Sequence, residues 1–99
     1  MIFVKIHRSV RNVVAICDSE LIGKRFEEGI REIEIKERFF RGKDLSKEEA
    51  ILIIKQQKME DATFNIVGKE AIEAAIEAEL ITKKHVGHID KIPFALVLD

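Results

Sequence analysis

The 99-residue chain has no tryptophan or tyrosine and only one cysteine and one proline. A single cysteine excludes an intrachain disulfide framework and a zinc site built from several cysteines. No apolar run approaches the ~20 residues that a membrane helix needs. We therefore expect no membrane span. No basic-then-apolar leader precedes the first strand-like segment, so we expect no secretory signal and take the cytoplasm as the default location.

The chain also lacks an excess of charge of either sign. Seventeen basic and eighteen acidic residues leave a net charge of -1, so the overall charge predicts no class of partner. Hydrophobic residues make up 46% of the chain and charged residues 35%, which argues against disorder and favours one domain over residues 1–99. Asparagine and glutamine occur twice each, and this scarcity beside many opposed charges is typical of thermophile proteins.

Apolar periodicity predicts strands near both ends of the chain. Alternation over residues 2–7 and a continuous apolar run over 13–17 indicate two strands joined as a hairpin. Residues 31–36 alternate again and predict a third, half-solvated strand, after a polar break at 27–29. Further strands are predicted at 62–67, 86–89 and 94–98, the last two as a terminal hairpin with Pro93 at its turn or edge.

Helices are predicted in the centre of the chain. Ser46 and Glu49 have the spacing of a capping box and start a helix that continues to about Lys58. A second amphipathic helix is predicted over 69–80, and Asp18 is expected to cap a single turn over 18–22. Residues 37–45 are predicted as a loop. This order favours an α+β fold with a small, mainly antiparallel or mixed sheet and two main helices packed on one face. The order of the strands is left open.

Cations and phenylalanine rings gather in the first half of the chain. RNA binding needs cations for phosphates and flat rings for bases. In the alternative interpretation, the phenylalanines fill the core and neighbouring glutamates weaken the positive field. The candidate nucleic-acid-binding residues are Lys24, Arg25, Arg38, Phe40, Arg41 and Lys43.

A second candidate site precedes the helix predicted at 69–80. Gly68 allows close backbone approach, and the free amides of a helix start suit an anion, with Lys69 adding charge. The alternative is structural: Gly68 makes the turn and Asn65 satisfies local backbone groups. Asn65, Gly68 and Lys69 are therefore the candidate anion-binding residues.

Catalytic and metal-binding patterns are weak. Cys17 could be activated by His7 across the hairpin, but a small buried hydrophobe at the end of a strand is the favoured interpretation. His85 and His88 are three apart on a predicted strand and face opposite sides, which suits no shared metal ion. We therefore predict no catalytic residue, no metal and no cofactor.

Several short motifs in order resemble a family of short archaeal proteins, the domain of unknown function 424. They are the segments 13–18 and 20–24, Phe26 and Gly29, the segment 65–68 with the alanine-rich helix after it, and the segment 93–95. The resemblance covers nearly the whole chain. It implies an archaeal, cytoplasmic α+β protein and supplies no reaction. Proteins of this kind tend to be encoded near genes for translation and the ribosome.

Two functions remain open at this point. One is a non-enzymatic accessory protein of translation or RNA metabolism, which contacts RNA or a ribonucleoprotein through the basic region between Lys24 and Lys43. The other is a protein-interaction module, including a homo-oligomer, which uses an exposed end strand or the loop at Phe39 and Phe40.

Overall fold

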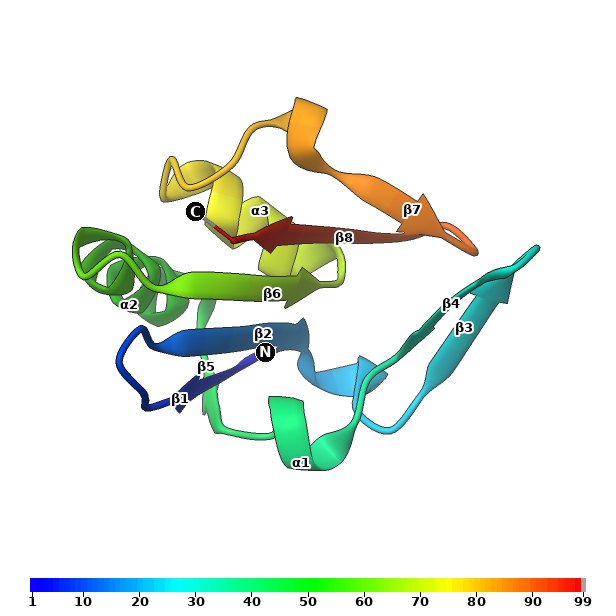
Figure 1. Ribbon diagram of the computed structural model, residues 1–99, viewed down its shortest axis with the longest axis horizontal. Coiled ribbons are helices and arrows are strands. Elements are labelled where there is room, and N and C mark those ends of the chain that lie inside the picture. The colour runs from blue at the N-terminus through cyan, green and yellow to red at the C-terminus, as the bar shows by residue number, and fades with distance from the viewer. Residues whose placement is uncertain (99) are drawn as a thin grey trace.

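A six-stranded mixed sheet organises the protein, whose computed structural model describes residues 1–98 (Figure 1). The strand order is β5-β1-β2-β6-β8-β7. β2 and β6 run parallel, and every other neighbouring pair is antiparallel. This confirms the predicted α+β class. The strands are β1 (Ile2–His7), β2 (Val13–Asp18), β5 (Lys43–Leu45), β6 (Thr63–Val67), β7 (Gly87–Ile89) and β8 (Ile92–Val97).

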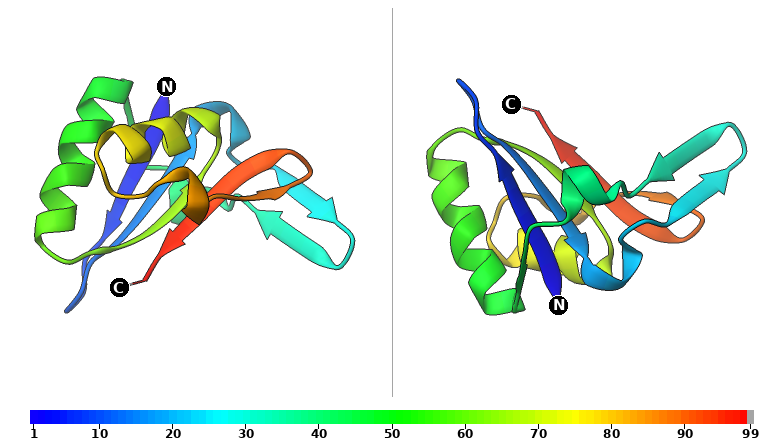
Figure 2. Two further views of the ribbon diagram at one scale, coloured as in Figure 1. Left: turned by 90° about the horizontal axis from the view of Figure 1, so that it is seen from above. Right: turned by 90° about the horizontal axis from the view of Figure 1, so that it is seen from below.

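The two main helices, α2 (Lys47–Met59) and α3 (Lys69–Glu77), cover one face of the sheet (Figure 2). The predicted capping box starts α2: Ser46 accepts the amide of Glu49, whose side chain accepts the amide of Ser46. Hydrogen bonds from the Ser46 amide and then from the Ser46 hydroxyl lower the pKa of the Glu49 carboxyl. In α3 the small side chains of Ala71, Ala74 and Ala75 are fully buried, which lets the helix lie close to the strands.

The opposite face carries shorter elements. A single 3₁₀ turn, η1 (Ser19–Leu21), and the short helix α1 (Glu37–Phe40) pack there (Figure 2). The prediction of a loop over 37–45 is therefore wrong, because this segment holds both α1 and β5. Both elements are too short to have a periodic sequence pattern and depend on contacts with β1. The second core lies beneath them and contains Phe3, Ala15, Cys17, Leu21, Ile35, Phe40 and Val67.

A two-stranded arm projects from this body beside β7 (Figures 1 and 2). It consists of β3 (Arg25–Glu28) and β4 (Arg31–Glu34). The prediction of a strand at 31–36 holds for its first four residues, but that strand belongs to the arm and not to the main sheet. The predicted polar break at 27–29 is mostly strand, and only Gly29, with φ 64°, lies in the turn.

The C-terminal hairpin turns through two residues. Asp90 and Lys91 have φ values of 50° and 66°, as a tight hairpin turn of the primed type requires. β8 therefore begins at Ile92, earlier than predicted, and contains Pro93 opposite His88. Before this hairpin, α3 ends at Glu77 and a 3₁₀ turn, η2 (Lys83–His85), follows.

Candidate functional site

The N-terminus of α3 is capped by a residue from another element. Asp18, at the end of β2, accepts hydrogen bonds from the backbone amides of Ala71 (2.8 Å) and Glu70 (3.1 Å). Its buried carboxylate also complements the positive end of the helix dipole. Asp18 was predicted to cap the turn that follows it, yet its side chain makes no hydrogen bond there.

This cap corrects the predicted anion site at Asn65, Gly68 and Lys69. Gly68 has φ 111°, and a Cβ built on it would lie 2.4 Å from Cγ of Asp18. The close approach that glycine permits is thus used by the protein's own carboxylate. Asn65 is half-buried on β6 and lines a different hollow, beside Phe94, while Lys69 is exposed. The three residues therefore do not converge on an open anion site.

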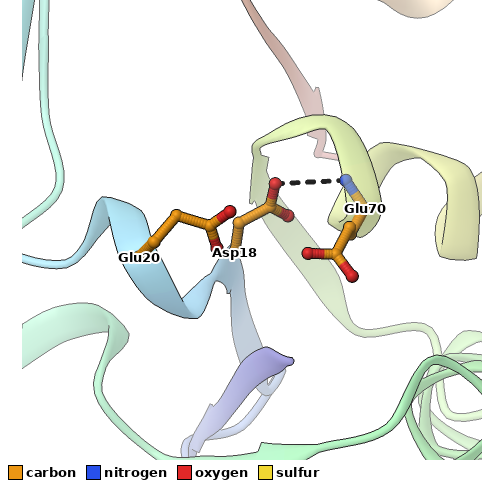
Figure 3. Close-up of side chains that lie close together, drawn as sticks. All are labelled: Asp18, Glu20 and Glu70. Atoms are coloured by element: carbon orange, nitrogen blue, oxygen red, sulfur yellow. Dashed lines mark hydrogen bonds between the residues drawn. The ribbon is translucent and has the colours of Figure 1, made fainter.

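Two glutamates lie beside this cap. One carboxylate oxygen each of Asp18, Glu20 and Glu70 lie within 4.8 Å of one another (Figure 3). Burial raises the pKa of Asp18, the amides of Ala71 and Glu70 oppose this shift, and the charges of Glu20 and Glu70 add to it. Oxygen ligands suit Mg²⁺ or Ca²⁺, but both oxygens of Asp18 already accept backbone amides. The terminal ammonium of Met1 lies 3.9 Å from Glu70. The group therefore acts first as a helix cap.

The structure gives Cys17 the environment of a core residue. Its side chain is fully buried, and burial, followed by the charges of Asp18, Glu20 and Asp44, raises its pKa to about 12. His7 lies opposite Val13 in the hairpin, whereas Cys17 lies opposite Phe3. The thiol therefore has no activating histidine across the hairpin, and it stays protonated at neutral pH.

The remaining histidines do not form a joint metal site. Nδ1 of His85 accepts the backbone amide of Thr82 at 3.0 Å and caps the turn η2. His88 is exposed on β7. Within residues 1–98, neither belongs to a group of side chains with the spacing of metal ligands.

Three of the six predicted nucleic-acid-binding residues are engaged within the protein. Arg25 pairs with Glu32 and Glu27 on the arm. Arg41 pairs with Glu37 at 2.7 Å and lies over the ring of Phe3. These contacts partly neutralise the two arginines. The ring of Phe40 is buried in the second core and offers no face to a base, which corrects its predicted role. Lys24, Arg38 and Lys43 are exposed and form no ion pair within residues 1–98.

Arg38 and Lys43 flank an incomplete edge of the main sheet. β5 pairs only with Ile2, Phe3 and Val4 of β1. At this point Gly42 contacts β1 so closely that a Cβ would lie 2.2 Å from the carbonyl oxygen of Val4. Gly42 lies between α1 and β5 in the chain. The second half of β1, residues 5–7, has no strand on its outer side within residues 1–98.

Two shallow hollows lie along this open edge and share Lys5. The first has a volume of about 380 Å³ and is lined by Lys5, His7, Lys36, Arg38 and Phe39. The second, of about 400 Å³, includes Arg8, Lys43 and Ile53. Neither lining contains a carboxylate. We call Lys5, Arg8, Lys36, Arg38 and Lys43, together with the rings of His7 and Phe39, the basic edge.

The rings of the basic edge are held in place by the fold. His7 and Phe39 stack with their centroids 4.6 Å apart and their planes 16° apart. Nε2 of His7 donates to the carbonyl of Phe39 at 2.9 Å, and the Lys5 amine donates to the carbonyl of Arg38 at 2.7 Å. Phe39 also meets the buried Phe40 edge to face. These contacts fix α1 against β1, so the basic edge exists before any ligand binds.

The comparisons agree with the resemblance in the sequence. The family described as "Protein of unknown function (DUF424)" matches residues 7–99. The chain belongs to this family. No curated protein matches. A crystal structure of an uncharacterized conserved protein from the archaeon Methanopyrus kandleri has a TM-score of 0.88 at 24% identity, covering 97% of this chain and 89% of that one. This likeness shows the fold. No helix within residues 1–98 has the length and apolar character to cross a membrane.

The sequence prediction missed four members of the basic edge: Lys5, His7, Arg8 and Lys36. It placed the ring of Phe39 near the basic residues. One signal was available, because alternation along β1 puts Lys5 and His7 on the same face. The other half of the site comes from α1, which was predicted as a loop. Residues 5–8 and 36–43 are far apart in the sequence. Because α1 was not predicted, nothing indicated that these two segments lie side by side.

Proposed function

We propose that this family member is a non-enzymatic, cytoplasmic accessory protein of translation or RNA metabolism, and that it binds RNA through the basic edge. The observation that carries the proposal is the basic edge itself: five cations and two rings lie along an open strand edge, and the lining of its hollows holds no carboxylate. Phosphates dominate RNA affinity, and fixed cations attract them without base specificity.

The overall charge of -1 is compatible with this role because binding depends on the local field. The Debye length is about 8 Å at physiological salt, so acidic groups on distant elements are largely screened from a phosphate at the basic edge. Arg8, Lys36, Arg38 and Lys43 are exposed and form no ion pair within the described part of the chain. Three or four phosphate contacts of this kind give a log–log salt slope of about -2 to -4.

Fluorescence anisotropy with a labelled RNA of mixed sequence, repeated over a range of salt, tests the proposal. Arg38→Glu combined with Lys43→Glu should abolish binding at low salt. Lys55→Glu combined with Lys84→Glu is the matched control, since it changes the charge equally at exposed positions on α2 and η2, and it should bind like wild type. If wild type and both double variants bind the RNA equally, RNA binding through the basic edge is ruled out as the function. The same follows if polyglutamate displaces the labelled RNA as well as unlabelled RNA does.

A second candidate is self-association through β8. β7 pairs only with the first half of β8, so the outer side of residues 95–97 has no partner strand within residues 1–98. Leu96 on this segment is 56% exposed, and Leu98, directly after β8, is 65% exposed. Light scattering that shows a dimer, converted to a monomer by Leu96→Lys, would support assembly as the function. A monomer at all concentrations would exclude it.

A further inference from the structure

We infer that the ligand of the basic edge is single-stranded RNA and that one unpaired base binds in the hollow lined by Lys36, Arg38, Phe39 and His7. This inference rests on the proposed function and makes it more specific. It depends on the ring pair, which a site for phosphates alone does not require.

The ring pair has the properties of a stacking platform. His7 and Phe39 stack on each other at 16°, so each ring covers one face of the other. Both rings are half-buried and line the hollow, and we infer that a base stacks on the outer face of this pair. Every nucleobase has a flat π-face and can stack on such a surface regardless of its identity. The rings are already ordered by the hydrogen bond between His7 and the Phe39 carbonyl and by contact with Phe40. The entropy cost of ordering them is therefore not incurred on binding.

The cations beside the rings suit the backbone of an unpaired nucleotide. Lys36 and Arg38 line the same hollow as Phe39 and are exposed. Lys43 and Arg8 line the neighbouring hollow, on the other side of Lys5. A strand that places a base on the rings can therefore place its adjacent phosphates near these cations. This combination of a cationic path with a ring is typical of proteins that bind single strands.

A double helix does not fit this arrangement. In A-form RNA the bases are stacked inside the duplex, and proteins contact mainly phosphates and 2′-hydroxyls. The rings of His7 and Phe39 lie in a hollow and are anchored to β1 and α1, so they cannot reach into a duplex. The duplex would use the cations only and would gain nothing from the rings.

The absence of tryptophan and tyrosine allows a direct test. Phe39→Trp places a single fluorophore at the hollow and keeps an aromatic face. Phe26→Trp is the matched control, since Phe26 is half-buried on β3 of the arm, outside the hollow. We expect a single-stranded RNA of mixed sequence to quench the emission of Phe39→Trp and leave that of Phe26→Trp unchanged. The same sequence as a duplex should quench neither.

Phe39→Leu provides a second, independent measurement. It keeps the apolar contact with Phe40 but removes the π-face, so affinity for the single strand should fall about 5- to 150-fold, the range that one base–aromatic stack supplies. The salt slope should stay unchanged because no cation is lost. Circular dichroism checks that each variant is folded.

The possible failures are distinguishable. If no RNA binds at low salt, the proposed function itself is wrong. If RNA binds but duplex and single strand bind equally, and Phe39→Leu matches wild type, the function stands and the single-strand inference is overturned. Unchanged emission of Phe39→Trp with bound single-stranded RNA would also overturn it.

Discussion

The side chain of Asp18 passes so close to Gly68 that no residue with a Cβ fits at position 68. A Cβ on residue 68 would lie 2.4 Å from Cγ and 2.6 Å from Oδ1 of Asp18. The two residues come from β2 and from the start of α3, and the carboxylate that passes over Gly68 accepts the amides of Glu70 and Ala71. The start of α3 therefore depends on both residues.

Gly68→Ala should destabilise the protein by about 2–4 kcal/mol. The substitution has two costs. Alanine is strained at a positive φ, and its Cβ displaces the Asp18 carboxylate from the amides of α3. Gly23→Ala is the control, because Gly23 also has a positive φ, 80°, but an added Cβ there meets nothing within 4 Å. Its cost should be only the backbone part, about 1–2 kcal/mol. Equal losses in urea denaturation would mean that the Asp18 contact contributes nothing.

The stability of the protein should carry a pH dependence that belongs to Asp18. Burial raises its pKa above the ordinary value of 3.8, so the folded state binds this proton more readily than the unfolded state. The Asp18 contribution to stability therefore increases as pH falls through the folded pKa and is complete below 3.8. The free energy of unfolding of wild type minus that of Asp18→Asn should rise as pH falls from 7 to 4. A difference that falls over this range contradicts the raised pKa.

The Cys17 thiol should not react in the folded protein. It is fully buried, and its pKa of about 12 leaves almost no thiolate at pH 8. Labelling with a disulfide reagent should proceed only after unfolding in guanidinium, which provides the positive control. Rapid labelling of the folded protein at pH 8 would restore the cysteine as a candidate nucleophile.

Gly42→Ala should loosen β5 without any strain from positive φ. An added Cβ would meet backbone atoms on β1: the carbonyl oxygen of Val4 at 2.2 Å and Cα of Lys5 at 2.8 Å. Backbone cannot rotate away, so we expect a loss of about 1–3 kcal/mol, as for overpacking. Amide hydrogen exchange should rise most in β5 and in its partners on β1. Unchanged exchange there would show that the edge accommodates a methyl group.

The sequence predicted features whose causes are local. The capping box at Ser46 and Glu49 needs residues three apart, and both hydrogen bonds are present. The α+β class followed from periodicity in the strands and in α3. The family resemblance was also confirmed, because its motifs are contiguous segments.

The sequence did not predict features that depend on distant contacts. The local sequence indicates that Asp18 caps the turn that follows it, η1. In the structure it caps α3, whose amides lie 52 and 53 residues further along the chain. α1 and β5 are four and three residues long, and contacts with β1 hold them in place. The basic edge needs both elements. Arg38, Lys43 and the ring of Phe39 could therefore be named from the sequence, but the stacking of Phe39 on His7 could not.

The parallel pairing of β2 with β6 has a consequence for biosynthesis. Val13 pairs with Thr63, so the centre of the sheet cannot form until most of the chain has left the ribosome. Until then the nascent β1–β2 hairpin exposes Ile2, Val14 and Ile16, which α2 and α3 later bury. Non-local pairing of this kind slows folding and exposes apolar surface to aggregation. The apolar face of the growing hairpin therefore stays open to aggregation until α2, β6 and α3 have been synthesised.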